Sequence, residues 1–223
     1  MIDVKNWISD ITKKLKDEFK NQLLFVGIQG SYGRNEANEH SDVDIVVILA
    51  NLNIENLTLY KKIINSMPYK EKACGFICGQ EELKNWSKYE LFQLYNDTKP
   101  VYGNMKKLIP TITKEDAKTA AKIGTENIYH MACHSFLHSN DSKESLKELY
   151  KTIFFILQAK YYYENGIYIS SKQELTAKLS GIEKEISQIS QAKQSIDNFT
   201  QEEINNSYKN LINFCSQLLK EYK

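Results

Sequence analysis

The stretch that decides the fold is GIQGSYGRNEANEHSDVDIVVILA, residues 27–50. It contains three glycines, two serines, the only arginine of the chain and an Asp-Val-Asp sequence, and it ends in the apolar run of residues 44–50. Another short apolar run, residues 23–28, overlaps its start. Short continuous apolar runs are typical of buried strands. We therefore predict two buried strands joined by a polar loop.

Two carboxylates, Asp42 and Asp44, stand where the second of these strands begins. At this spacing in a strand, both side chains point to the same face, and their oxygens can converge on one hard cation. Two carboxylates that close repel each other unless a metal neutralises them. Mg²⁺ prefers oxygen ligands and usually keeps coordination positions for water and substrate phosphates. The pair therefore predicts a magnesium site with a role in catalysis.

Three residues of the loop predict a phosphate-binding site beside this metal. Gly30 lets the backbone approach a phosphate closely, and Ser31 offers a hydroxyl and an amide. Arg34 stands in a chain whose other basic residues are all lysine, and a guanidinium meets a phosphate with two parallel donors in a fixed plane. A Gly-Ser pair alone is a turn in most proteins, and a lone Asp-x-Asp is usually a solvated cap. Together, with ten residues between them and apolar strands on both sides, they predict a phosphate-binding site that faces a metal site.

The rest of the chain falls into two parts of different character. Helical patterns over residues 3–20, 55–67 and 81–96 alternate with the two strands and a third predicted strand at 73–79, which favours an α/β layer. After the Pro and Gly turn region of 99–104 and Pro110, only helices are predicted. Four helix N-termini are indicated by polar residues followed three positions later by an acid: Thr113 with Asp116, Asp141 with Glu144, Ser171 with Glu174, and Thr200 with Glu203.

This pattern predicts an α+β protein of two domains. The first, residues 1–108, is an α/β domain with a short mixed sheet, and the second, residues 109–223, is an all-α helical bundle. One helix of the bundle is expected to stop at the sequence Glu-Asn-Gly, residues 164–166, because glycine is the commonest C-terminal cap.

The segment GSYGRNEANEHSDVDIVV, residues 30–47, resembles the nucleotidyltransferase superfamily that includes DNA polymerase beta. It is most similar to the small bacterial members that modify aminoglycosides and lincosamides and carry a C-terminal helical domain. The resemblance implies transfer of a nucleoside monophosphate, with ATP favoured as donor, to a hydroxyl of a small molecule such as an antibiotic, and release of pyrophosphate. In this reading Asp42 and Asp44 hold Mg²⁺, while Gly30 and Ser31 hold the triphosphate.

The chain departs from this family at one position. Active members generally present a third carboxylate from a neighbouring strand, and residues 73–79 contain none. Glu71 precedes this strand, and Glu81 and Glu82 follow it. Two rival functions therefore stay open: a catalytically degenerate module that binds nucleotides, and nucleotidylation of a toxin-like protein partner. The extra helices count against the second, because protein-modifying members are often a bare catalytic domain.

Three histidines, His130, His134 and His138, recur every four residues on the first predicted helix of the bundle. We interpret them as a polar seam in the bundle in preference to a zinc site, because no carboxylate or cysteine with zinc spacing completes the set. A third interpretation pairs Glu126 with His130 as the catalytic base that deprotonates the acceptor hydroxyl, as resemblance to kanamycin-type enzymes implies. The apolar face beside the stripe is predicted to include Ile128, Met131, Ala132 and Phe136.

Composition narrows the class and the partners. The chain has 223 residues with 42% hydrophobic and 26% charged residues, as is usual for soluble globular proteins, and its formal net charge of +1 gives no field to hold a nucleic acid. We expect a small-molecule acceptor, no nucleic acid and no membrane partner, with a homodimer left open. No apolar run approaches the roughly 20 residues of a membrane span, and the N-terminus lacks a signal-peptide core. We therefore expect a cytoplasmic protein whose four cysteines are buried thiols.

Overall fold

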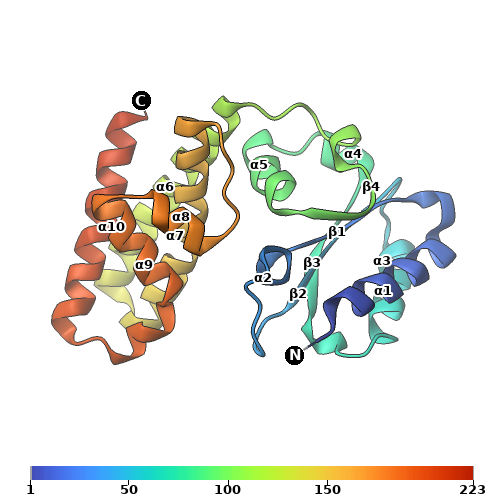
Figure 1. The fold of residues 1–223 in the computed structure, drawn as a ribbon, viewed down its shortest axis with the longest axis horizontal. Helices are drawn as coiled ribbons and strands as arrows, with labels where there is room; N and C mark the ends of the chain where they lie inside the picture. Colours follow the sequence, from blue (N-terminus) through green and yellow to red (C-terminus); the bar gives the residue numbers. More distant parts are fainter. Residues whose placement is uncertain (1, 223) are drawn as a thin grey trace. The chain divides into compact units, whose positions relative to one another are not determined.

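The computed structural model describes residues 2–222, and it divides the chain into two compact units, Met1–Ile112 and Thr113–Lys223 (Figure 1). The division lies four residues after the predicted boundary at 108, and independent folding of the two parts stays a prediction. The first unit combines helices with a small mixed sheet and the second is helical. The predicted α+β fold class is therefore confirmed.

The first unit alternates strands and helices, as the sequence pattern predicts. Its elements in chain order are α1 (Val4–Phe19), η1 (Lys20–Gln22), β1 (Leu23–Gln29), α2 (Gly30–Arg34), β2 (Val43–Leu49), α3 (Ile54–Asn65), η2 (Lys70–Lys72), β3 (Ala73–Gly79), α4 (Gln80–Lys84), α5 (Lys88–Asp97), β4 (Lys99–Gly103) and η3 (Met105–Lys107).

The four strands form one sheet in the order β3-β2-β1-β4. β1 runs antiparallel to both of its neighbours, while β2 and β3 are parallel. The register places Gln29, the last residue of β1, opposite Asp44, the second residue of β2. The end of β1 and the start of β2 therefore lie side by side at one end of the two central strands, and the predicted site lies there.

Each face of this sheet has its own hydrophobic core. Val43, Ile45 and Val47 of β2 face the core formed with α1 and α3. Val46 and Ile48 face the other core, which is completed by residues of α4 and α5 (Figure 1). Because side chains alternate along a strand, Asp44 shares the face of Val46 and Ile48. This alternation aims Asp44 to the side of the sheet on which α5 lies.

Three features of the first unit differ from the sequence prediction. The helix predicted over 81–96 is two helices, α4 and α5, with a break at residues 85–87. The segment 99–103, predicted as a turn region because of its Pro and Gly, is the edge strand β4, where a proline is tolerated. The loop after β1 contains the short helix α2. A helix of five residues is too short to show a periodic pattern in the sequence.

The second unit consists of five helices and a 3₁₀ segment within the described residues. They are α6 (Lys114–His138), α7 (Ser142–Asn165), α8 (Lys172–Lys178), α9 (Gly181–Gln191), η4 (Lys193–Asn198) and α10 (Gln201–Glu221). α6 packs against α7 and α10, and α7 also contacts α9. The core between them includes Tyr150, Phe154, Leu157, Tyr208 and Leu211.

The four predicted helix starts in this unit are confirmed. Thr113, Asp141, Ser171 and Thr200 are the N-caps of α6, α7, α8 and α10, and each side chain accepts a hydrogen bond from the backbone three residues later. The predicted end of α7 is also confirmed, because Gly166 caps it with φ of 72°. Helix α9 was not predicted from the sequence, although Ser180, its N-cap, is followed by Glu183 at the diagnostic spacing; the Ser180 side chain makes no capping hydrogen bond.

Among residues 2–222, none of the helices has the length and hydrophobicity that a membrane span requires. The four cysteines are free thiols. Burial raises the pKa of Cys78 to about 12, with a further contribution from the Glu82 carboxylate, and Cys215 is buried as well. The prediction of buried thiols is wrong for Cys74, which is exposed, and for Cys133, which is only half-buried.

Candidate active site at the edge of the sheet

The predicted phosphate-binding turn lies at the junction of β1 and α2. β1 ends at Gln29 in extended backbone, and Gly30 begins α2 with φ of 67°, in the left-handed region that glycine adopts without strain. Ser31 follows and is half-buried. The chain therefore turns sharply at Gly30, and the turn presents a serine at the edge of the sheet.

The Asp44 carboxylate lies directly against this turn. A Cβ atom added to Gly30 would overlap Oδ2 of Asp44. The Asp44 carboxylate therefore occupies the space that a side chain at position 30 would fill. Asp42 is exposed in the extended segment just before β2. The structure thus brings the glycine of the predicted phosphate turn and a carboxylate of the predicted metal pair into contact, although they are 14 residues apart in the sequence.

These residues fit a hydrated divalent cation that carries phosphates. Carboxylate oxygens are the ligands that Mg²⁺ prefers, and the Ser31 hydroxyl stands two residues from Gln29, the register partner of Asp44. The chemistry of this donor set is charge neutralisation beside a polyphosphate, which is what displacement at phosphorus requires.

Arg34, the last residue of α2, has a contact that the sequence did not indicate. Its Nη1 donates to Oδ2 of Asp97 at 2.7 Å, and its Nε donates to Oε2 of Glu36 at 3.1 Å. The side chains of Arg34 and Asp97 are 9% and 3% exposed. No sequence signal marks Asp97 as its partner, because the two residues are 63 positions apart. A direct contact of Arg34 with phosphate stays a prediction.

The position beside Asp44 on the neighbouring strand is held by Cys74. The parallel register of β2 and β3 pairs these two residues. The residue of β3 next to Asp44 is therefore a cysteine and not a carboxylate. Glu81 and Glu82 belong to α4, beyond the other end of β3. The third carboxylate that the family resemblance implies is therefore not supplied by β3.

The histidine stripe of α6 differs from its interpretation as a polar seam. His130, His134 and His138 are exposed, and the rings of His134 and His138 lie 5.0 Å apart. α6 buries a different face, on which Ile128 and Ala132 are buried. The predicted apolar face is wrong for Met131 and Phe136, each of which is 53% exposed. Within residues 2–222 no group of three or more His, Cys, Asp or Glu side chains is arranged to hold a metal ion.

Glu126 lies one helical turn before His130, and both are exposed on α6. Residues four apart are neighbours on a helix surface, so the pair can act together. Their role as a catalytic base stays a prediction.

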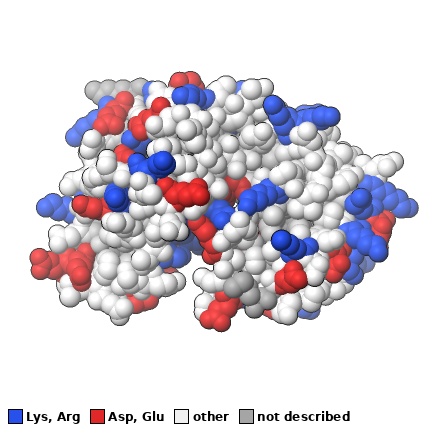
Figure 2. All heavy atoms as spheres, in the orientation of Figure 1, with Lys and Arg blue, Asp and Glu red and all other residues white. Residues whose placement is uncertain are grey.

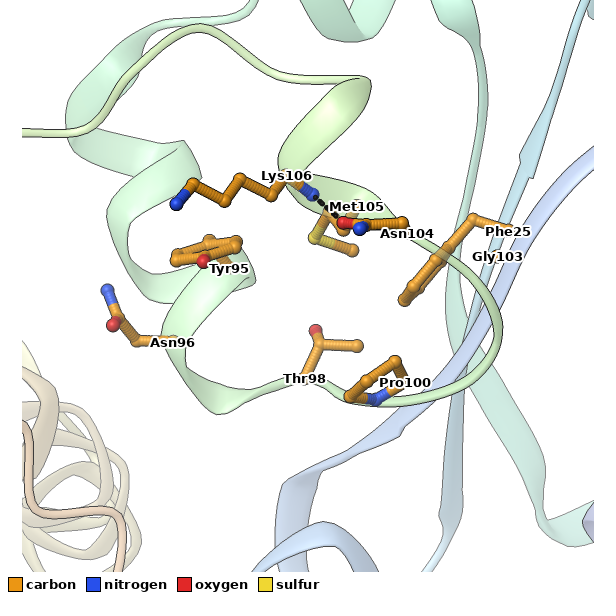
Figure 3. A pocket seen from close by; sticks show the side chains of 9 residues that line it. All are labelled: Phe25, Tyr95, Asn96, Thr98, Pro100, Gly103, Asn104, Met105 and Lys106. Carbon is orange, nitrogen blue, oxygen red and sulfur yellow. Dashed lines mark hydrogen bonds between the residues drawn. The ribbon is translucent and has the colours of Figure 1, made fainter.

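A cavity of about 480 Å³ lies elsewhere in the first unit, between α5, β4 and η3 (Figure 3). The side chains of Phe25 and Met105 line it with Tyr95, and polar groups come from Thr98 and Asn104. None of the predicted site residues lines this cavity. We therefore place the candidate active site by the contact of Gly30 with Asp44 and not by this cavity.

A mixed sheet in which a Gly-Ser turn packs on Asp44 of an Asp-x-Asp pair fits the predicted nucleotidyltransferase domain. Comparison with known proteins agrees: residues 8–101 match the family model described as nucleotidyltransferase domain. The match lies within the first unit and covers less than half of the chain, so it marks this unit as similar to a nucleotidyltransferase domain.

The fold is shared by a solved structure. The spectinomycin adenyltransferase AAD(9) from Enterococcus faecialis, solved with ATP and spectinomycin, is 16% identical, and the match covers 97% of this chain and 99% of that chain with a TM-score of 0.59. A toxin-antitoxin structure with AMP-PNP is 18% identical and matches 57% of this chain and 93% of that chain, with a TM-score of only 0.33. No curated protein sequence matches the chain.

Proposed function

We propose that the protein transfers a nucleoside monophosphate from a nucleoside triphosphate, with ATP favoured, to a hydroxyl of a small molecule, in a reaction that depends on Mg²⁺ and releases pyrophosphate. The observation that carries this proposal is the packing of the Asp44 carboxylate into the space left by Gly30. It joins a phosphate-binding turn to a metal-binding carboxylate. The similar adenyltransferase was solved with an antibiotic acceptor, which supports a small molecule and makes antibiotics the first acceptors to try.

In the proposed reaction the acceptor oxygen forms a bond to the α-phosphorus while the bond to the β-phosphate bridging oxygen breaks. The hydroxyl proton goes to a base, and pyrophosphate leaves with the bond electrons. Asp42 and Asp44 would hold the cation, which when bound neutralises the phosphates and polarises the reacting phosphorus. Gly30 would let the triphosphate approach the backbone closely, and the Ser31 hydroxyl would donate a hydrogen bond to it. We propose Glu126 with His130 as the base.

A second candidate function is nucleotide binding without turnover. The observation that favours it is Cys74, which occupies the sheet position beside Asp44 and is not a carboxylate. The two candidates share the triphosphate site and differ in whether an acceptor is consumed.

Acceptor-dependent pyrophosphate release separates the two. We expect the wild-type protein with ATP and Mg²⁺ to release pyrophosphate when a panel of aminoglycosides, spectinomycin and lincosamides is added, and to release less than a tenth as much without an acceptor. Mass spectrometry of the acceptor should then show an added nucleoside monophosphate.

The matched control is the same assay with each acceptor lacking its free hydroxyls. Nucleotide binding without acceptor-dependent release over the whole panel, including a peptide library, would contradict transferase activity and leave the binding module. Transfer to protein and not to small molecules would instead support nucleotidylation of a partner protein.

A further inference from the structure

Arg34 and Asp97 form a buried ion pair between the predicted phosphate turn and a different part of the first unit. Arg34 ends α2, the helix that begins at Gly30, and Asp97 ends α5. The 2.7 Å contact joins two side chains that are 9% and 3% exposed. Charged side chains are rarely this buried unless they are paired. The pair is therefore a built feature of the interior and not a surface contact.

The position of Asp97 is unfavourable for its own helix. A carboxylate at a helix C-terminus faces the partial negative charge of the last carbonyl groups, and its burial costs free energy unless a cation offsets it. Arg34 supplies that cation, and it stands at the end of α2, where a positive charge is favourable. The Asp97 carboxylate does not stabilise α5, but its ion pair with Arg34 can anchor α2.

The short helix α2 depends on such anchors. A helix of five residues is far below the length that is stable alone, so the direction of Gly30 and Ser31 is set by what holds α2 in place. The backbone of Gly33 also lies close to Asp97, because a Cβ atom added to Gly33 would lie 3.6 Å from the carbonyl oxygen of Asp97. α2 therefore lies next to Asp97 and is tied to it by the Arg34 side chain.

We propose that Arg34 is a positioning residue: it pairs with Asp97 to hold α2 so that Gly30 and Ser31 face the triphosphate. This inference rests on the proposed function of the site. It assigns a role in nucleotide binding to Asp97, whose negative charge would repel a phosphate and which cannot grip one directly. A direct Arg34 to phosphate contact makes the opposite prediction for Asp97, and this difference decides the test.

The test is calorimetric titration of Asp97→Asn and Arg34→Lys with a non-hydrolysable ATP analogue in Mg²⁺ and, separately, with adenosine. We expect the Kd for the analogue to rise at least tenfold in both variants, while the Kd for adenosine changes less than threefold. In the double variant the Kd should match the weaker single variant within threefold, because residues that act as one unit are not additive. Asp97→Glu keeps the charge but lengthens the side chain, so it should also weaken binding of the analogue. This variant replaces Asp97→Asn in the test if Asp97→Asn does not fold.

Glu148→Gln, which removes an exposed ion pair with Lys151 in the second unit, is the control and should bind like the wild type. If Asp97→Asn binds the analogue at least as well as the wild type while Arg34→Lys binds it worse, the inference is overturned in favour of a direct contact of Arg34 with phosphate. Equal weakening of analogue and adenosine would also overturn it, because it indicates general destabilisation. A wild type that binds neither compound would overturn the proposed function and this inference together.

Discussion

Asp44→Asn is expected to lower the rate of nucleotidyl transfer by roughly 1,000-fold, because loss of a metal-binding carboxylate removes several kcal/mol of transition-state stabilisation and each 1.4 kcal/mol is a factor of ten. Asparagine has the same shape and can still pack against Gly30, so the fold should persist. The rate is measured by acceptor-dependent pyrophosphate release, and circular dichroism melting curves check the fold.

Asp17→Asn is the matched control, since Asp17 is exposed on α1, away from the site. It should keep the full rate. Asp44→Asn with a rate within tenfold of the wild type would mean that Asp44 does not hold the catalytic cation.

Gly30→Ala is expected to lower transfer by at least about 100-fold, the loss that follows a displacement of reacting groups by roughly 1 Å. The added Cβ would overlap Oδ2 of Asp44, so the carboxylate and the turn have to separate. The φ of 67° adds strain of roughly 1–2 kcal/mol for a residue with a side chain. Transfer rate and melting temperature are measured on the same preparation.

Gly181→Ala isolates the strain from the overlap. Gly181 has φ of 53°, and a Cβ atom there meets nothing within 4 Å. This variant should lose a similar amount of stability, about 1–2 kcal/mol, and keep its activity. If both variants keep the wild-type rate, the packing of Asp44 on Gly30 has no role in catalysis.

Much of the fold was predictable because its signals are local. Strands β1, β2 and β3 are continuous apolar runs, and the caps Thr113 and Thr200 satisfy free amides of their own helices. Elements whose formation depends on distant contacts were missed. Strand β4 forms by pairing with β1, and five-residue α2 is held by contacts with other elements, so neither leaves a periodic pattern in the sequence.

The site divides in the same way. The proximity of Gly30 to Asp44 was predictable because their spacing joins two apolar runs, and sheet pairing then brings Gln29 opposite Asp44. The pairing of Arg34 with Asp97 was not predictable, because it joins residues 63 positions apart. The exposure of the α6 histidines was missed because spacing on a helix shows which residues share a face but not which face the bundle buries.

The central claim is that the Gly30 turn and the Asp42 and Asp44 carboxylates together hold a triphosphate and a magnesium ion. The most direct measurement is calorimetric titration of the wild type and Asp44→Asn with a non-hydrolysable ATP analogue, each with Mg²⁺ and with a chelator. We predict that the chelator raises the wild-type Kd at least tenfold, and that Asp44→Asn binds weakly and equally under both conditions. Equal affinity of the wild type with and without Mg²⁺ would contradict the claim.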